Sequence, residues 1–282
     1  MAATLAEIHR LPVMLTQVTT YPNLRAAFLR VEASHGMAGV DGVSLGEFRH
    51  NLEVNLAVLG AELRSGRYQP LPLLRFLVAK ADGSPRALAV PTVRDRVAQA
   101  AVLNIVEPLF EAQFEDVSFA YRRGRSVKAA ALRIRELRDQ GYRYLVNADL
   151  DAFFDNVDHD LLLAKVGPVI TDPGILNLIR LWVKSEVYDG ERVFVLEKGI
   201  PQGAVVEATE EVLARLHLAL DAEDTAITDF DQGFKFLGLI FLKDSIFVPF
   251  DRPRRERKVL YFPPPFDLAG YFAAKERCPN RP

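Results

Sequence analysis

A cluster of carboxylates lies in the middle of the chain, in the stretch NADLDAFFDNVDHD at residues 147–160. Carboxylates at the end of a strand that faces a pocket are a usual way to hold Mg²⁺ with oxygen ligands. In two-metal phosphoryl transfer, two ions about 3.5–4 Å apart stabilise both the attacking and the leaving oxygen. Such a site needs carboxylates from more than one strand, because one strand cannot surround two ions. The stretch is therefore a candidate for part of a metal site.

The aspartates of this stretch differ in what their positions predict. Asp149 follows a mostly apolar run and is the strongest candidate for a metal ligand. Asp151 would share its face of the strand for as long as the strand lasts, because side chains alternate. Asp155, Asp158 and Asp160 are more simply explained as turn and helix-cap residues.

The elements that must position these side chains include helices and hairpins before the cluster. Ser44 and Glu47 predict a capping box at the start of one long helix, which Gly66 ends. LLRFLVAK and PRALAV predict two strands around an ADGS turn. Thr92 is expected to cap a helix that runs to about residue 114, and Ser126 a second one that runs to about residue 140.

Around and after the cluster, the pattern continues to mix strands and helices. YRYLVNADL predicts a buried strand, and Asp172 with Pro173 predicts the start of a helix that runs to about residue 184. Hairpins are expected at Asp189-Gly190 and at residues 243–244, with an acidic helix over 206–219 between them. Hairpins dominate the connections between strands, so the predicted fold class is α+β rather than doubly wound.

The net charge of the chain is −2, but the charge is unevenly distributed. Residues 121–144 carry eight Lys or Arg against two acids, and residues 252–258 carry five against one. Residues 205–232 carry eight acids and one Arg. Local basic segments of this kind suit a polyanionic partner, although most are only solvated surface.

The chain is expected to be a cytoplasmic protein that does not enter a membrane. Its single cysteine, Cys278, excludes an internal disulfide framework, which fits a reducing compartment. The first residues are interrupted by charged side chains, so no signal-peptide core is predicted. No apolar run is long enough to span a membrane.

Several motifs together resemble a family. DLDAFFDNVDHD resembles the first catalytic motif of bacterial reverse transcriptases of the group II intron and retron-like class, with a CRISPR-associated type as one alternative. GVDGVS, LVAKADGSPRALAVPTVRDRVAQAAV, SFAYRRGRSVKAA, KGIPQGA and FKFLGLIF resemble further segments of that family, in the family's order. The resemblance covers roughly residues 36–250, and six motifs in the correct order make it specific.

The resemblance implies an RNA-directed DNA polymerase that adds dNTPs to a DNA primer on an RNA template. It implies that Asp149 and the backbone carbonyl of Leu150 bind Mg²⁺, with Mn²⁺ as an alternative ion. Lys80 and Arg86 would neutralise the triphosphate. Phe154 would exclude a 2′-hydroxyl group on the incoming nucleotide.

The resemblance also implies two further groups of site residues. Gln202 and Gly203 would shape the floor beneath the nucleotide. The basic stretch that begins at residue 122 would contact phosphates of the template and primer, independently of sequence. The residues expected to do so are Arg122, Arg123, Arg125 and Lys128.

The sequence departs from the family after Ala204. The family continues there into a helix and a hairpin with a Tyr/Phe-Ala-Asp-Asp box, which supplies the remaining metal-binding carboxylates, and no such box occurs in this chain. Asp229 and Asp231 fall at positions where the family has no catalytic acids, so they are read as turn residues. An internal deletion of the box region would remove or severely reduce polymerisation.

The resemblance predicts the fingers and palm of a right-hand polymerase, with a truncated palm and an absent or incomplete thumb. The expected division is a helical and fingers region at 1–72, fingers at 73–142, palm at 143–242 and a C-terminal hairpin and tail at 243–282. The alternatives to a polymerase are a non-catalytic RNA- or DNA-binding remnant and a metal-dependent nuclease or phosphotransferase that uses Asp149, Asp151 and Asp155. The sequence does not indicate an oligomeric state.

Overall fold

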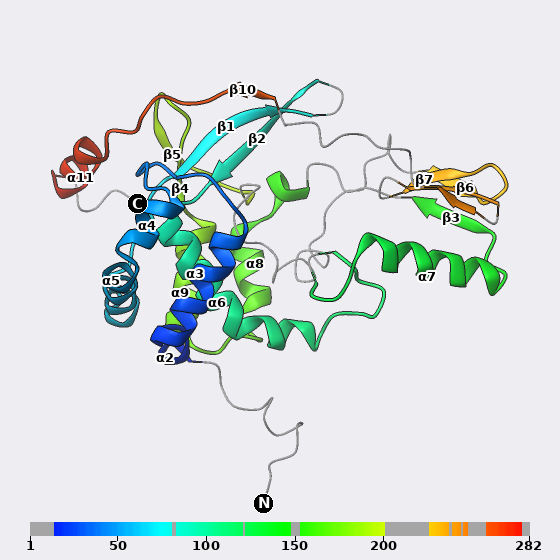
Figure 1. Ribbon diagram of the computed structural model, residues 1–282, viewed down its shortest axis with the longest axis horizontal. Coiled ribbons are helices and arrows are strands. Elements are labelled where there is room, and N and C mark those ends of the chain that lie inside the picture. The colour runs from blue at the N-terminus through cyan, green and yellow to red at the C-terminus, as the bar shows by residue number, and fades with distance from the viewer. Residues whose placement is uncertain are drawn as a thin grey trace, which may run out of the picture.

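The fold is a mixture of α-helices and small β-sheets (Figure 1). The computed structural model describes residues 14–80, 83–120, 122–147, 153–200, 226–236, 239–243, 245–247 and 258–277. A cluster of helices lies beside a five-stranded sheet, and α7 lies apart from them with two smaller sheets (Figure 1). The predicted α+β class is confirmed.

The largest hydrophobic core lies within the helix cluster and is formed by apolar side chains from helices that are far apart in the sequence. Leu24, Leu59, Val97 and Ile175 are almost completely buried there. The helices that form the cluster are α2 (Leu15–Val18), α3 (Tyr21–Ala33), α4 (Leu45–His50), α5 (Leu52–Ser65), α6 (Val93–Glu111), α8 (His159–Val166) and α9 (Pro173–Val183).

Side-chain caps fix where α4, α6, α8, α9 and α7 (Val127–Asp139) begin, as the sequence predicts. Ser44, Thr92, Ser126, Asp158 and Asp172 each accept a hydrogen bond from the backbone N–H three residues later. Such caps satisfy one of the backbone donors that a helix leaves without an internal partner. The expected caps are confirmed, including that of Asp158, whose carboxylate starts α8.

The prediction of a single helix between Ser44 and Gly66 is wrong, because the helix is interrupted at Asn51. Asn51 has φ −114° and ψ 35°, and it ends α4 and begins α5. The Nδ2 group of Asn55 donates to the carbonyl oxygen of Phe48 at 2.9 Å, so a side chain satisfies an acceptor at the break. Gly66 ends α5 with φ +70°, as expected.

The five-stranded sheet is built around the hairpin of β1 (Leu73–Ala79) and β2 (Pro85–Val90). β1 pairs in parallel with β4 (Glu186–Tyr188), which forms a second hairpin with β5 (Val193–Val195). The turn between β4 and β5 spans residues 189–192, where Asp189 accepts hydrogen bonds from the N–H groups of Glu191 and Arg192. Both hairpins that the sequence predicts here are confirmed.

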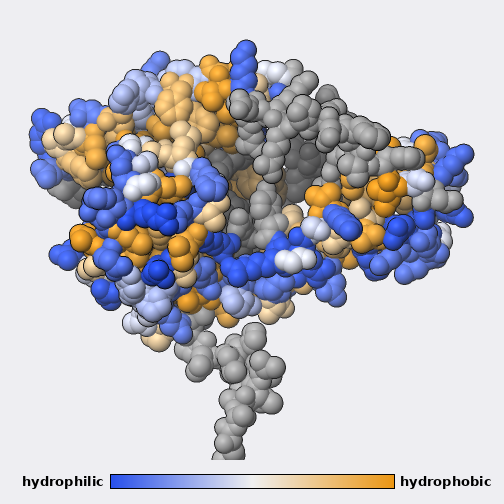
Figure 2. Space-filling view, in the orientation of Figure 1, coloured by the Kyte–Doolittle hydropathy of each residue, from blue (hydrophilic) through white to orange (hydrophobic). Residues whose placement is uncertain are grey.

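A C-terminal segment that the sequence analysis did not place returns to this sheet. β10 (Val259–Tyr261) pairs with β1 as an antiparallel edge strand, and α11 (Leu268–Arg277) follows it. The hydroxyl group of Tyr271 and the ammonium group of Lys275 both contact the carboxylate of Glu186. Apolar side chains gather at the top of the molecule over β5 and β10, where they are exposed (Figure 2).

The smaller sheets lie against α7. β3 (Tyr144–Asn147) pairs with β6 (Ala226–Asp229), and β7 (Phe234–Phe236), β8 (Leu239–Leu242) and β9 (Ser245–Phe247) form a three-stranded sheet. Ala131 and Ile134 of α7 pack against Phe230 and Phe241. The expected hairpin at residues 243–244 is confirmed by β8 and β9.

The prediction that the strand before the aspartate cluster is buried is wrong. Tyr144 is 78% exposed and Val146 is 64% exposed. Within the described residues, β6 is the only strand that pairs with β3, and the face of β3 that carries Tyr144 and Val146 is exposed. The apolar run was read as a buried strand, and it forms instead a short strand in a two-stranded sheet.

The expected domain boundaries at residues 72, 142 and 242 remain predictions, and the sheet of β1 crosses two of them through β4 and β10. The acidic helix expected over 206–219 lies outside the described residues. Among the helices that the structure describes, none has the length and apolar composition needed to cross a membrane.

Candidate nucleotide and nucleic-acid site

Several of the expected site residues lie outside the described part of the chain. These are Asp149, Leu150, Gln202 and Gly203. Within the described residues, no three His, Cys, Asp or Glu side chains are grouped as metal ligands. The roles of these residues therefore remain predictions from the sequence. The geometry given below is that of the described residues next to them in the sequence.

A turn within the aspartate cluster is held against the segment that leads to Gln202. Residues Phe153–Asn156 form a 3₁₀ turn. The backbone N–H of Ile200 donates to the carbonyl oxygen of Phe154 at 2.7 Å, and that of Gly199 donates to the carbonyl oxygen of Val157 at 2.7 Å. Two motifs more than 40 residues apart in the sequence thus lie side by side.

Gly199 makes this close approach feasible. Its φ of +88° lies in the left-handed region, and a Cβ atom added there would come within 2.8 Å of the carbonyl oxygen of Asp155. Only glycine has both the backbone freedom and the missing side chain that the contact requires. The first glycine of the KGIPQGA motif, Gly199, is therefore explained by its packing against the aspartate-containing turn.

His159 adds a side-chain contact to the same junction. Its Nε2 atom lies 2.7 Å from the carbonyl oxygen of Gly199, and its side chain is buried. A carbonyl oxygen only accepts hydrogen bonds, so Nε2 carries the proton in this contact. His159, which the sequence analysis did not single out, thus fixes the loop relative to the start of α8.

Phe154 lies at this junction with its side chain half-buried. Its ring packs edge-on against that of Phe153, with 5.1 Å between the centroids, and both rings contact the hydrophobic core. The turn is further held by Lys198, whose Nζ donates to Asn156 Oδ1 at 2.8 Å. Phe154 is therefore placed by packing on one side and by its backbone hydrogen bond to Ile200 on the other.

Lys80 and Arg86 lie at the turn end of the β1–β2 hairpin. Arg86 pairs with Val78, and the backbone N–H of Lys80 donates to the carbonyl oxygen of Ser84 at 2.8 Å. Opposed residues of an antiparallel pair share a face, and so do residues two apart. If the alternation continues one residue beyond β1, the exposed side chains of Lys80 and Arg86 lie on the same face of the hairpin.

Arg122 is used inside the protein. Its side chain is 4% exposed, and its guanidinium group donates to both carboxylate oxygens of Glu111, at 2.6 and 3.1 Å. It also donates to the carbonyl oxygens of Glu115 and Ser118 and lies over the ring of Phe114. These contacts leave little of the guanidinium group for a phosphate, so the structure favours an anchoring role for Arg122.

The other basic residues of this segment are more accessible. Arg123 is 72% exposed, and its Nε lies 3.1 Å from Glu107. Lys128 is exposed in the first turn of α7. Arg125 is 29% exposed, contacts Asp116 and lies over the ring of Phe119. Arg123 and Lys128 are therefore the members of the expected group whose charges face solvent most openly.

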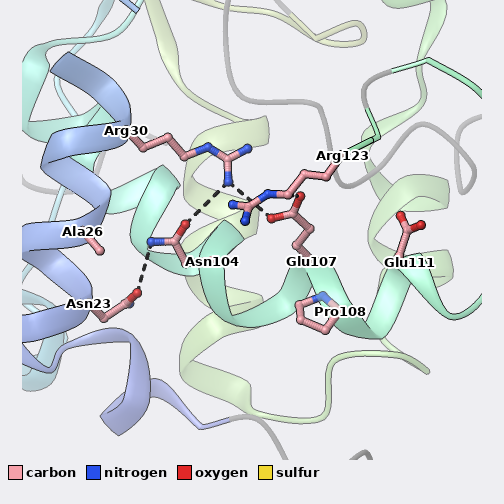
Figure 3. A pocket seen from close by; sticks show the side chains of 8 residues that line it. All are labelled: Asn23, Ala26, Arg30, Asn104, Glu107, Pro108, Glu111 and Arg123. Carbon is pink, nitrogen blue, oxygen red and sulfur yellow. Dashed lines mark hydrogen bonds and ion pairs between the residues drawn. The ribbon is translucent and has the colours of Figure 1, made fainter. Parts of the chain in front are cut away.

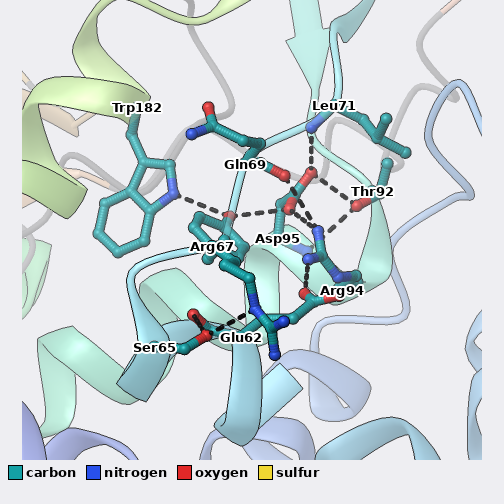
Figure 4. A network of polar contacts seen from close by, with 10 residues as sticks. Glu62, Ser65, Arg67, Gln69, Leu71, Thr92, Arg94, Asp95 and Trp182 are labelled. Carbon is teal, nitrogen blue, oxygen red and sulfur yellow. Dashed lines mark hydrogen bonds and ion pairs between the residues drawn. The ribbon is translucent and has the colours of Figure 1, made fainter. Parts of the chain in front are cut away.

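A buried polar network that the sequence analysis missed joins the β1–β2 hairpin to the helices (Figure 4). Asp95, at the start of α6, is 1% exposed. It accepts hydrogen bonds from the hydroxyl groups of Tyr68 and Thr92 and from the N–H of Leu71, at 2.8–3.0 Å. The indole N–H of Trp182 donates to the Tyr68 oxygen at 3.0 Å, which links α9 to the network.

Arg94 closes this network by contacting both carboxylates near it. Its guanidinium group pairs with Glu62 and Asp95 and lies over the ring of Tyr68. Burial raises the pKa of the Asp95 carboxyl, and the hydrogen bonds and Arg94 oppose that effect. The motif TVRDR contains Thr92, Arg94 and Asp95, so an Asp three residues after a helix-capping Thr was the signal available in the sequence.

Residues 78–207 match a family model described as "Reverse transcriptase (RNA-dependent DNA polymerase)". The chain is 35% identical over 199 residues to protein YkfC of Escherichia coli K12, a match that covers 68% of this chain and 52% of YkfC. It is 32% identical over 157 residues to the group II intron-encoded protein LtrA of Lactococcus lactis, covering 55% of this chain and 26% of LtrA.

Residues 78–207 therefore carry the sequence of the reverse transcriptase family, and the chain is similar to group II intron-encoded proteins. It spans about half the length of YkfC and about a quarter of that of LtrA. Among solved structures, a chain of a partial Cas6-RT-Cas1–Cas2 complex aligns with a TM-score of 0.49 and 20% identity, covering 93% of this chain and 40% of that one.

Proposed function

We propose that the chain is the fingers and part of the palm of an RNA-directed DNA polymerase, with its own polymerase activity severely reduced. The observation that supports this most is the junction of the 153–157 turn with residues 199–200. It puts Phe154 next to the loop that continues into Gln202 and Gly203. A nucleotide gate and a nucleotide floor have to be neighbours in this way.

The proposed roles follow from the family and from these positions. Asp149 and the backbone carbonyl of Leu150 would bind Mg²⁺ or Mn²⁺, since reverse transcriptases are typically metal-dependent. Lys80 and Arg86 would contact the triphosphate from the hairpin face they share. RNA template and DNA primer would lie along the basic segment that contains Arg123 and Lys128.

The reduced activity follows from the carboxylates that the sequence lacks. No Tyr/Phe-Ala-Asp-Asp box follows Ala204, so Asp149 would provide only part of the coordination that two ions require. Asp229 Oδ1 accepts a hydrogen bond from the N–H of Gln232 in the β6–β7 turn, which supports the interpretation of Asp229 as a turn residue. An internal deletion of the box region accounts for these observations.

Primer extension on poly(rA)–oligo(dT) with Mg²⁺ tests the proposal. We expect oligonucleotide binding with extension that is absent or close to the background of the Asp149→Ala variant. Robust extension that Asp149→Ala abolishes would disprove the reduced activity while supporting the assigned ligand. Cleavage of the oligonucleotide that Asp149→Ala abolishes would favour a nuclease instead.

The alternative is a non-catalytic protein that binds RNA or DNA, and the exposed basic residues after α6 favour it. Binding that weakens with rising salt, without any extension by the protein in Mg²⁺ or Mn²⁺, would support this alternative. Absence of binding even at low salt would contradict both functions.

A further inference from the structure

An open groove of about 780 Å³ lies between α3, α6 and the segment that precedes α7 (Figure 3). Its rim carries charged and amide side chains from all three elements, while Ala26 and Pro108 form apolar parts of its wall. The polar side chains that line it are Asn23, Arg30, Asn104, Glu107, Glu111 and Arg123.

Two arginines meet at one carboxylate in this groove. Arg30 Nη1 lies 3.3 Å from Glu107 Oε2, and Arg123 Nε lies 3.1 Å from Glu107 Oε1. The two guanidinium groups come from segments more than 90 residues apart, and Figure 3 shows both of them beside the Glu107 carboxylate. A single anion in the position of that carboxylate would therefore reach both arginines.

Amide groups continue the line of polar side chains along the groove. Arg30 Nη1 donates to Asn104 Oδ1 at 3.5 Å, and Asn104 Nδ2 donates to Asn23 Oδ1 at 3.2 Å. Asn23 in turn donates to the backbone carbonyl oxygens of Val18 and Ala101, both at 2.9 Å. These contacts hold Asn104, and through it Arg30, in one orientation on the groove wall.

The contact between Arg123 and Glu107 is weak enough to exchange. The Arg123 side chain is 72% exposed and that of Glu107 is 22% exposed, and ion pairs that water reaches in this way contribute about 1 kcal/mol or less. A phosphodiester group offers the same bidentate acceptor geometry to a guanidinium group as a carboxylate does. Arg123 also belongs to a segment, residues 121–144, with eight bases and two acids, whose field attracts polyanions.

We propose that this groove binds a phosphate of a nucleic-acid strand, at a place separate from the nucleotide site. Arg123 and Arg30 contact the phosphate, and Glu107 is the counter-ion that the phosphate displaces from Arg123. The proposal rests on the proposed function in taking nucleic acid as the ligand and in placing it along the segment of Arg123, and it adds Arg30 and Glu107 as parts of the site. RNA and DNA share the phosphodiester backbone, so both are ligands of the proposed site.

The test is fluorescence anisotropy of the full chain with labelled single-stranded RNA and DNA of one sequence, over a series of salt concentrations. Arg123→Ala and Arg30→Ala should each weaken binding roughly threefold to tenfold at low salt. Each should also reduce the slope of log K against log salt by about 0.7. Glu107→Gln should strengthen binding, because it removes the competing charge.

A second pair of residues on α3 and α4 supplies matched controls. Arg49 Nε lies 3.2 Å from Glu32 Oε1, and its side chain is 64% exposed. Arg49→Ala and Glu32→Gln change the net charge as the groove variants do, but outside the groove, so they should leave both the affinity and the slope nearly unchanged.

The outcomes separate the groove from the function as a whole. Groove variants that behave like Arg49→Ala and Glu32→Gln, while the unmodified chain binds, would overturn the groove and leave the proposed function standing. An effect with RNA alone or with DNA alone would overturn the phosphate assignment. A chain that binds neither oligonucleotide would overturn both proposals.

Discussion

The imidazole Nε2 of His159 lies 2.7 Å from the carbonyl oxygen of Gly199, in a buried contact between the start of α8 and the loop that follows β5. This hydrogen bond and the two backbone bonds of Gly199 and Ile200 hold the aspartate-containing turn in one position. The geometry of the proposed nucleotide site therefore depends on how closely residue 199 can approach that turn.

Gly199→Ala should lower the free energy of unfolding by about 2–3 kcal/mol, because a Cβ atom would clash with the Asp155 backbone at a φ of +88°. Gly66→Ala is the matched control, since Gly66 has φ +70° with nothing within 4 Å of an added Cβ. It should cost about 1–2 kcal/mol from backbone strain alone. Urea unfolding followed by circular dichroism measures both, and equal losses would show that the close approach is unimportant.

Tyr68→Phe should cost about 1–3 kcal/mol, because it removes one of the hydrogen bonds to the buried Asp95 carboxylate and leaves the indole N–H of Trp182 without its partner. The control is Tyr261→Phe, which removes a hydroxyl group that donates to the carbonyl oxygen of Asp189 at a side chain 41% exposed. Water can replace that contact, so the control should cost less than about 0.5 kcal/mol. Thermal unfolding measures the stability of both variants. Equal losses would show that the buried network does not contribute to stability.

Local signals in the sequence predicted much of this fold. Helix starts at Thr92 and Asp172 follow from a side chain that satisfies nearby backbone donors, and this is decided within four residues. The turn at Asp189 is equally local. These elements form for reasons that are present in their own short segments, so one sequence suffices to find them.

Features that depend on distant partners were missed or misread. The apolar strand at Tyr144 was expected to be buried, but burial depends on which strands flank it. The pairing of β10 with β1 joins residues about 180 positions apart, and no local pattern encodes it. In the same way, Arg122 lies in a basic segment, which is typical of a phosphate contact, and only its short distance from Glu111 revealed an internal role.

Tyr271→Phe should weaken the attachment of α11 to the sheet by about 1 kcal/mol, because it removes the hydrogen bond to Glu186. Burial and this hydrogen bond raise the pKa of the Tyr271 hydroxyl. A group whose pKa is raised on folding stabilises the protein below its unfolded pKa of about 10 and loses that contribution as the pH rises. The unmodified chain should thus lose stability above pH 10 more steeply than Tyr271→Phe does, and parallel losses would contradict the contact.

The pair of Glu111 and Arg122 should make the stability of the segment before α7 depend on acid pH. The hydrogen bonds from Arg122 hold the pKa of the Glu111 carboxyl below its ordinary value of 4.5. A carboxyl whose pKa is lowered on folding adds stability above the unfolded pKa, and that stability is lost as the pH falls through the folded pKa. Glu111→Gln should therefore be less stable than the unmodified chain at pH 7, and the difference should shrink below about pH 4.5.

The control for this prediction is Glu136→Gln, which removes an exposed carboxylate that pairs with Arg133 on the surface of α7. Exposed pairs of this kind contribute little, so its difference from the unmodified chain should be small at every pH. Urea unfolding across the acid range measures both variants. A Glu111→Gln difference that stays constant from pH 7 to below pH 4 would show that the charge of Glu111 does not hold Arg122 in place.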